Sequence, residues 1–312
     1  MIPRFPYTLG LFLLSLSLCG GCQEAPSPVA VSPSVASSIL PTEIAPQSHR
    51  ELDLFFQEKK YGWESLENGV PPLIVTRFPE DMATISKVQQ RKEIFFLSLL
   101  PMTLLANEEI LKERKELLTI LDRFDRQSPP NPQQMVFLSA LGQKYKVKGD
   151  PLTQKGSRQK LLKRVDIVPP SMVLAQAASE SAYGTSRFAQ EGNNIFGEWT
   201  FTPGTGIVPE GRPEGESYEI RRFSSLYDSL NSYLRNINTH WAYQELRDLR
   251  AGQRAQKETV TGSALAAGLR LYSTRRDAYV EDIRRIIDGN RLSHLAKISL
   301  RSTNASAEPT TD

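Results

Sequence analysis

The sequence feature that most constrains the fold is a long stretch that carries a single charge. Between Asp166 and Arg187 the only charged side chain is that of Glu180. Residues 170–183 read PSMVLAQAASESAY, so apolar or small side chains fall on all sides of a helix. A proline in the first turn and a glycine after the last residue favour these bounds. Because a helix of this kind is normally buried on all sides, we predict a helix here that other helices enclose.

Glu180 is the one ionisable group in that helix. Burial disfavours the charged form of a carboxyl group, so we expect the pKa of Glu180 to lie above the reference of about 4.3. A glycosidase uses a carboxyl group that stays protonated near neutral pH to protonate a leaving oxygen, a step worth about 10² to 10⁴ in rate. The alternative is a structural glutamate that caps a neighbouring helix or pairs with an arginine.

The region before this helix, residues 49–165, has a mainly helical pattern. Apolar side chains recur at helical spacing over residues 86–124, although Pro101 should kink or split that helix. Charged residues flank the apolar run and Ser98 interrupts it, which favours core helices over a membrane span. Shorter helices are predicted at residues 51–59, 135–141 and 157–165.

Composition excludes several classes of protein. The 312 residues include 38 Lys and Arg against 35 Asp and Glu, and the net charge of +3 is too small to indicate nucleic acid as a partner. Both cysteines fall within the first 22 residues, which excludes a disulfide framework, a thiolate zinc site and a cysteine nucleophile from the folded part. The three histidines, His49, His240 and His294, are too scattered to suggest a metal site, and no cofactor is indicated.

The first 21 residues have the features of an export signal. Arg4 is the only charge, residues 9–18 are apolar, and two glycines precede Cys22. The LCGGC segment at residues 18–22 resembles a bacterial lipoprotein signal, which would make Cys22 the lipid-anchored N-terminus of a protein in the cell envelope, facing the periplasm. Ordinary secretion is the alternative. Residues 22–48, rich in Pro, Ser and Ala, would form an extended spacer.

Motifs between residues 65 and 290 resemble those of a glycosidase family. The segments AQAASESAYG at 175–184 and NNIFG at 193–197 are similar to the signature of the bacterial endo-β-N-acetylglucosaminidase family, which includes flagellar muramidase-type domains. The Bax-like branch is the nearer match, because more motifs follow it in order. These are VPP at 70–72, ANEEIL at 106–111, RPEG at 212–215, YEI at 218–220, YLRNINTH at 233–240, LYST at 271–274 and AYVEDI at 278–283.

The resemblance implies a mainly α (α+β) fold: a lysozyme-like helical lobe, a small β hairpin lobe across a cleft and an N-terminal helical extension. It also implies cleavage of peptidoglycan sugar chains. The catalytic domain would span residues 166–291, followed by a tail at 292–312. Glu180 stands where the family has its catalytic acid, and Tyr272 stands where it has a tyrosine near the reacting sugar.

Four side chains in or beside the signature motifs are candidates for sugar binding: Tyr183, Asn194, Phe196 and Trp199. An amide can bind N-acetyl or hydroxyl groups, and aromatic faces can stack on sugar rings. The alternative is a tight loop whose aromatic residues fill the core. Tyr272 could likewise form only a structural hydrogen bond.

A second carboxyl group is expected in the hairpin region, residues 201–223. The candidates are Glu210, Glu214, Glu216 and Glu219. Alternation over residues 218–222 predicts a strand, and Glu219 is preferred because it lies in the YEI motif. Carboxyl groups about 5 Å apart would predict retention of configuration, and about 6.5–9.5 Å would predict inversion. If none of them qualifies, the acetamido group of the substrate is the alternative.

The sequence and the resemblance together predict an exported, lipid-anchored enzyme that hydrolyses peptidoglycan, with Glu180 as general acid and Glu219 as the preferred candidate among the hairpin carboxylates for its partner. Its partners would be peptidoglycan glycan strands and, through the anchor, a membrane. Two alternatives stay open. One is a lytic transglycosylase, which leaves a 1,6-anhydro sugar without using water, and the other is a non-catalytic cell-wall-binding lipoprotein.

Overall fold

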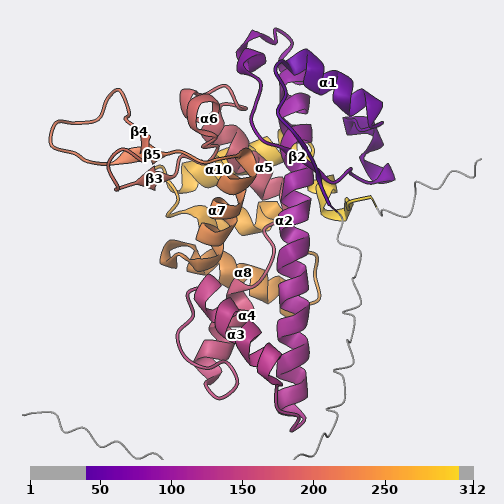
Figure 1. Ribbon diagram of the computed structural model, residues 1–312, viewed down its shortest axis with the longest axis vertical. Helices are drawn as coiled ribbons and strands as arrows, with labels where there is room; N and C mark the ends of the chain where they lie inside the picture. The colour runs from indigo at the N-terminus through magenta and orange to yellow at the C-terminus, as the bar shows by residue number, and fades with distance from the viewer. Residues whose placement is uncertain (1–39, 302–312) are drawn as a thin grey trace, which may run out of the picture. The chain divides into compact units, whose positions relative to one another are not determined.

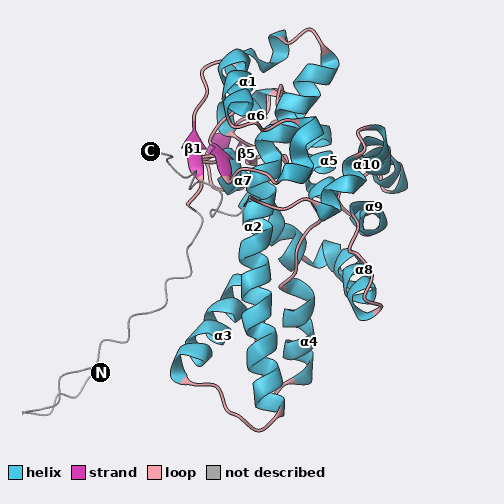
Figure 2. Cartoon of the chain, turned by 90° about the vertical axis from the view of Figure 1, so that its right-hand side faces the viewer, coloured by secondary structure: helices cyan, strands magenta, loops and turns pink. Residues whose placement is uncertain are grey.

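The computed structural model describes residues 40–301 and is mainly helical (Figure 1, Figure 2). The predicted signal segment, the anchor Cys22, most of the spacer and the end of the predicted tail lie outside the described residues. The α-helices are α1 (His49–Glu58), α2 (Val88–Asp125), α3 (Pro132–Lys144), α4 (Lys155–Arg164), α5 (Pro170–Ser181), α6 (Arg187–Gly192), α7 (Leu226–Thr239), α8 (Gln244–Ala255), α9 (Gly262–Leu265) and α10 (Asp277–Gly289). The strands are β1 (Thr42–Ile44), β2 (Leu73–Val75), β3 (Trp199–Thr200), β4 (Gly206–Ile207) and β5 (Glu219–Arg221). The predicted mainly α class with a small β part is confirmed.

The helix α2 runs through Pro101 without a break, so the predicted split does not occur. Proline has no backbone N–H, which leaves the carbonyl of Leu97, four residues earlier, without its helical donor. Tyr61 supplies that donor, because its buried hydroxyl donates a hydrogen bond of 3.1 Å to the Leu97 oxygen. A side chain from the region before α2 thus allows the helix to continue.

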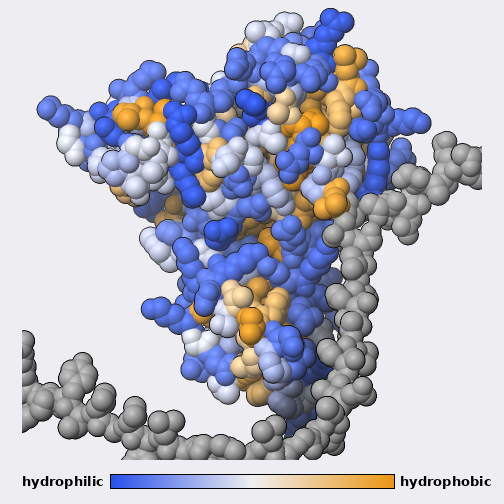
Figure 3. All heavy atoms as spheres, in the orientation of Figure 1, coloured by the Kyte–Doolittle hydropathy of each residue, from blue (hydrophilic) through white to orange (hydrophobic). Residues whose placement is uncertain are grey.

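By length and composition α2 is able to cross a membrane, but 83% of its most apolar window is buried inside the protein. The face of the protein shown in Figure 3 is mostly hydrophilic, and its apolar residues gather in separate patches. A helix buried to this extent belongs to the core, as the sequence predicts.

The helix α5 lies in the main core. It packs against α2, α9, α10 and the 3₁₀ segment Leu292–Lys297, and every residue from Pro170 to Ala178 is buried. The prediction of an enclosed helix is therefore confirmed. The same cluster of buried side chains draws on residues 52–110 and on residues 168–300. The predicted upstream region and the predicted catalytic segment therefore share one core.

A second, smaller core joins the far part of α2 to α3 and α4 (Figure 2). Its side chains include Leu117, Leu121, Leu138, Leu141 and Leu161. The helix α3 begins at Pro132, earlier than predicted, because Asn131 caps it and the proline suits the first helical position. The Asn131 side chain accepts a hydrogen bond of 2.9 Å from the N–H of Gln134.

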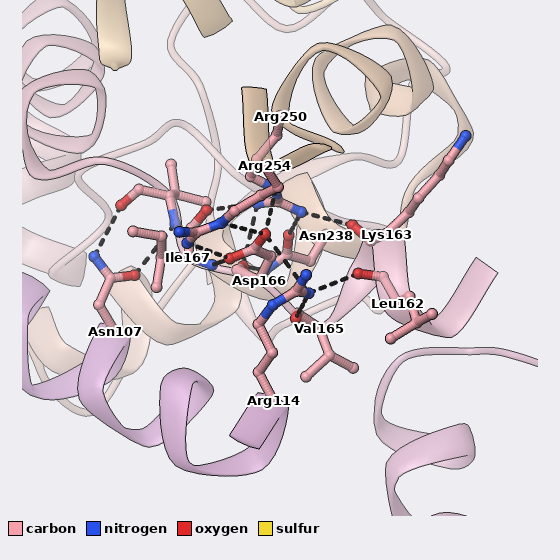
Figure 4. A network of polar contacts seen from close by, with 11 residues as sticks. Asn107, Arg114, Leu162, Lys163, Val165, Asp166, Ile167, Asn238, Arg250 and Arg254 are labelled. Atoms are coloured by element: carbon pink, nitrogen blue, oxygen red, sulfur yellow. Dashed lines mark hydrogen bonds and ion pairs between the residues drawn. The ribbon is translucent and has the colours of Figure 1, made fainter. Parts of the chain in front are cut away.

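The junction between α4 and α5 is held by the buried carboxylate of Asp166 (Figure 4). Arg254 donates two hydrogen bonds to it at 2.9 and 3.2 Å, and Arg114 and Arg250 form ion pairs with it at 3.6 and 3.9 Å. Burial alone would raise the pKa of Asp166, but the Arg254 hydrogen bond and the charges of Arg250 and Arg114 hold that pKa below its ordinary value. These contacts fix α2 and α8 to the segment that leads into α5.

After α6 the chain forms a three-stranded antiparallel sheet in the order β3-β5-β4. Ile220 pairs with Trp199 on one side and with Ile207 on the other. The sheet therefore begins at Trp199, before the predicted hairpin region, and has three strands. In Figure 1 this sheet and its long loops project beside α7, on the side away from α2.

Candidate active site

The turn after α5 places the side chain of Glu180 at the end of the helix. The helix ends at Ser181, and the next three residues, Ala182, Tyr183 and Gly184, have left-handed backbone conformations with φ of 50°, 56° and 78°. The hydroxyl of Ser181 supports the turn by accepting a hydrogen bond of 2.9 Å from the N–H of Gly184. An abrupt end of this kind exposes one side of the last helical turn, where Glu180 lies.

The carboxyl group of Glu180 is partly buried and has one hydrogen-bond donor within the described residues. Tyr279 of α10 donates to Oε1 at 2.7 Å. Burial raises the pKa of Glu180 and the Tyr279 hydrogen bond lowers it, with a net shift upward. The other oxygen, Oε2, lies on the side of Gly197, where an added Cβ would be 4.0 Å away. Oε2 is therefore the oxygen available to a substrate.

Two further side chains set the direction of the Tyr279 hydrogen bond. Tyr233 of α7 donates to Oε1 of Gln176 at 2.6 Å, and Nε2 of Gln176 donates to the Tyr279 oxygen at 3.0 Å. Because the Tyr279 oxygen already accepts from Gln176, its own hydrogen points to Glu180. Gln176 and Tyr233 are buried, so water does not compete for these bonds. The one signal for this arrangement in the sequence is the polar Gln176 inside an apolar helix, and Tyr233 and Tyr279 were not among the predicted site residues.

Glu180 opens into a cleft of about 930 Å³ between the helices and the sheet. Its aromatic lining consists of Phe196, Trp199, Phe201, Tyr233, Tyr243 and Tyr272. Trp199 and Phe201 are 56% and 70% exposed. The Trp199 ring also stacks on Tyr218, with ring centroids 4.5 Å apart. Exposed aromatic faces in a cleft can pack on the apolar faces of sugar rings.

The structure brings Tyr272 into the same cleft as Glu180. The Tyr272 ring stacks on Tyr279 at a centroid distance of 5.2 Å, and its hydroxyl donates to the carbonyl of Phe196 at 3.0 Å. Burial raises the pKa of Tyr272 well above its ordinary value, so the phenol stays neutral. Tyr272 thereby steadies both Tyr279 and the loop that leads to Trp199.

A second carboxyl group in the cleft belongs to Glu198. Ser232 donates to its Oε2 at 2.8 Å, and Arg221 lies 3.8 Å from the same oxygen. Burial raises the pKa of Glu198, whereas the Ser232 hydrogen bond and the charges of Arg221 and Arg235 lower it, with a net shift upward. Its Oε1 is buried without a hydrogen-bond partner among the described residues. The predicted candidates all follow residue 201, and the signal for Glu198 was its place directly after the NNIFG motif.

Glu219, the predicted catalytic partner, does not line this cleft, and neither do Glu210, Glu214 and Glu216. The Glu219 carboxylate accepts backbone hydrogen bonds from Gly204 at 2.9 Å and from Gly206 at 2.7 Å. These bonds hold the pKa of Glu219 below its ordinary value. Glu219 therefore closes the turn between β3 and β4, and this structural role replaces the predicted catalytic one.

Asn194 also has a structural role in place of the predicted sugar contact. The residue is 1% exposed. Its side-chain nitrogen donates to the carbonyls of Glu198 and Arg221, and its oxygen accepts from the N–H of Glu198. The amide therefore braces the loop against the sheet and has no group free for a substrate.

Phe196 and Tyr183 were also predicted to bind sugar, but their rings pack against other aromatic side chains. Phe196 is 4% exposed and its ring is stacked on Tyr233 at 3.8 Å, so its face belongs to the core. Tyr183 packs edge-on against Phe95 and Phe96 of α2 and lies outside the cleft. Of the four predicted sugar-binding residues, only Trp199 presents an exposed face in the cleft.

The ionisable groups that line the cleft are two carboxyl groups, three phenols, two guanidinium groups, the Lys146 ammonium and the His240 imidazole. Within residues 40–301 no three His, Cys, Asp or Glu side chains are placed to hold a metal ion. The cleft is thus equipped for proton transfer and for binding a hydroxyl-rich ligand.

This chain is similar to one protein family, one curated protein and one solved structure. The family described as mannosyl-glycoprotein endo-beta-N-acetylglucosaminidase matches residues 156–292. Protein bax of Escherichia coli K12 is 35% identical over 189 residues, which make up 61% of this chain and 66% of that protein. The chain thus spans just under two thirds of the length of that relative. The catalytic domain of the autolysin Auto from Listeria monocytogenes is 17% identical over 56% of this chain and 95% of that chain, with a TM-score of 0.32.

Proposed function

Because residues 156–292 form a domain of the glucosaminidase family, we propose that this protein hydrolyses the glycan strands of peptidoglycan at N-acetylglucosamine, with Glu180 as general acid. One observation carries the proposal. Glu180 has a raised pKa, stands in a cleft lined by aromatic side chains and keeps one carboxyl oxygen free. A carboxyl group in this state can donate a proton near neutral pH.

The reaction begins with a proton on Oε2 of Glu180, because Oε1 accepts the Tyr279 hydrogen bond. As the bond between C1 and the glycosidic oxygen breaks, this proton passes to the leaving oxygen, which becomes a hydroxyl group. Glu180 is left as a carboxylate, and the Tyr279 hydrogen bond strengthens with the new charge. Tyr279 therefore stabilises the product of the proton transfer more than its reactant.

Glu198 is the second carboxyl group of the proposed reaction. Burial raises the pKa of both carboxyl groups, but Arg221 and Arg235 lower that of Glu198, whereas no cation within residues 40–301 lowers that of Glu180. Two carboxyl groups whose surroundings differ in this way divide the acid and base roles between them. As an anion, Glu198 stabilises the positive charge that develops on the sugar. It then takes a proton from the attacking water, whose oxygen forms the new bond to C1.

Aromatic side chains position the sugar rings in this proposal. The exposed faces of Trp199 and Phe201 stack on rings to either side of the scissile bond. The Tyr272 hydroxyl donates to Phe196, and its oxygen can still accept the N–H of the 2-acetamido group. Selectivity for an N-acetylated sugar would follow from this contact.

The test is digestion of purified sacculi by the wild type, by Glu180→Gln and by the matched control Glu191→Gln, whose carboxylate is exposed and paired with Arg187 outside the cleft. We expect the wild type and the control to release fragments with reducing N-acetylglucosamine ends, and Glu180→Gln to release at least about 100-fold less. Fragments with 1,6-anhydro ends would instead show a lytic transglycosylase. Equal release by Glu180→Gln would refute the role of Glu180, and no release by any form would favour a wall-binding protein.

We also propose that the protein is an exported lipoprotein with Cys22 as its anchor, on the strength of the N-terminal sequence alone. Labelling cells with a radioactive fatty acid tests this. The wild type and Cys19→Ser should take up label and fractionate with membranes, whereas Cys22→Ser should be unlabelled. Label retained in Cys22→Ser would contradict the assignment.

A further inference from the structure

A second pocket, of about 510 Å³, adjoins the cleft that holds Glu180. Arg221, Ser232 and Arg235 line both the pocket and the cleft, so the two cavities meet along these side chains. The opposite wall of the pocket comes from Ile110 of α2 and Lys144 of α3. That wall lies outside residues 156–292, the part that matches the family.

The pocket and its junction with the cleft carry more positive than negative side chains. Lys144, Arg221, Arg222 and Arg235 line the pocket against Glu109 and Asp228. Some of these charges are already engaged, since Lys144 pairs with Glu113 at 2.6 Å and Arg222 donates to backbone carbonyls.

Arg235 differs from the other cations of the pocket. It is exposed, lies at the junction of the two cavities and forms no side-chain hydrogen bond or ion pair within residues 40–301. Lys146, which lines the cleft but not the pocket, is also exposed and unpaired within that range. An unpaired cation at the junction and a second one in the cleft are suited to an anionic branch on a ligand that occupies the cleft.

We propose that this pocket binds the carboxylate-bearing peptide branch of the glycan strand, with Arg235 as a specificity-determining residue. The inference rests on the proposed function. Every second sugar of a peptidoglycan strand carries a short peptide with free carboxylates. A strand bound in the cleft would therefore place one of these peptides beside the cleft, where the pocket adjoins it. A volume of about 510 Å³ is in the range of pockets that hold small ligands. The upstream helices would then contribute to substrate choice as well as to the core.

The experiment compares kcat/KM on peptide-bearing glycan strands with kcat/KM on strands whose peptides an amidase has removed. The full-length wild type should prefer the peptide-bearing strands, and Arg235→Gln should lower the ratio of the two values about tenfold. Lys146→Gln, which removes the other unpaired cation, should lower the ratio in the same direction. The matched control is Arg126→Gln, which removes the same charge from the exposed end of α2, at 77% exposure, and should leave the ratio unchanged.

A third substrate identifies the recognised group. Strands whose peptide carboxyls are converted to amides should be cleaved by the wild type at the rate of peptide-free strands. An unchanged ratio in Arg235→Gln, or full activity on the amidated strands, would overturn the inference. If the wild type cleaves peptide-free and peptide-bearing strands equally well, the inference fails and the proposed function stands. If it cleaves neither, the proposed function itself fails.

Discussion

Tyr279 donates a hydrogen bond of 2.7 Å to the carboxyl group of Glu180 from a position 99 residues further along the chain. A donor to a carboxylate favours the ionised form, so this bond lowers the pKa of Glu180 against the effect of burial. The strength of the proposed acid is thus set by a residue of another helix.

Replacing Tyr279 with Phe should raise the pKa of Glu180 further, because the donor to its ionised form is lost. The general acid acts in its protonated form, so the alkaline limb of the pH–rate profile should move to higher pH. The maximal rate should fall by about 10- to 100-fold, since the carboxylate formed by proton transfer loses its partner. The measurement is kcat/KM as a function of pH, with Tyr227→Phe, outside the cleft, as control. An alkaline limb that stays in place would contradict the link between the two residues.

Replacing Glu198 with Gln should lower kcat by about 100-fold with a small change in KM, because the amide can neither take a proton nor stabilise a positive charge. Steady-state kinetics on soluble glycan fragments measure both values. If Glu198→Gln keeps full activity while Glu180→Gln is inactive, the acetamido group of the substrate has the role proposed for Glu198.

Replacing Glu219 with Gln should instead leave kcat within a few-fold of the wild type and loosen the turn that Glu219 closes. The carboxylate holds the amides of Gly204 and Gly206, so their hydrogen exchange should become faster in the variant. Because the pKa of Glu219 is lowered in the folded protein, this protection is present above the ordinary carboxyl value of 4.5 and is lost as the pH falls through the lowered pKa. A large loss of kcat without faster exchange would restore the catalytic role predicted from sequence.

Replacing Asp166 with Asn should destabilise the fold by about 3–5 kcal/mol, because it leaves buried guanidinium groups without their counter-charge. The free energy of unfolding, measured by urea denaturation at several pH values, checks this. The lowered pKa of Asp166 means that its contribution is present above its ordinary value of 3.8 and is lost as the pH falls through the lowered pKa. The difference between wild type and variant should therefore shrink in strong acid. A difference that is constant with pH would contradict the role of the charge.

Replacing Tyr61 with Phe should cost about 1–3 kcal/mol, because the carbonyl of Leu97 is then buried without a donor. In a Pro101→Ala background the alanine N–H can supply that donor, so the same replacement should cost less. A double-mutant cycle of thermal or urea unfolding measures the coupling. Additive effects of the two substitutions would show that the hydroxyl does not compensate for the proline.

Local sequence patterns were enough to predict the enclosed helix α5 and the raised pKa of Glu180, because one charge in an apolar helix can be recognised from the sequence itself. The partners of Glu180 could not be predicted in this way. Tyr279 and Gln176 act through tertiary contacts, and Glu198 accepts its side-chain hydrogen bond from Ser232 of α7.

Residue type alone predicted contact with a substrate for side chains that instead bond to the protein itself. An asparagine amide suits a sugar and a backbone equally well, and Asn194 bonds to the backbone. Glu219 occurs in a matched motif, but its oxygens face the N–H groups of its own loop. Only the folded geometry distinguishes these roles. The same holds for Pro101, whose effect on α2 depends on a tyrosine 40 positions earlier.

The core shared by residues 52–110 and 168–300 limits how this domain can be transferred from one protein to another. The family match begins at residue 156, yet α5 packs against α2, which lies wholly upstream. A gene fragment cut at the family boundary would encode a helix without its neighbour, with apolar surface left in water. Transfer of this domain to another protein would therefore require the upstream helices as well, because the folding unit is larger than the segment that matches the family.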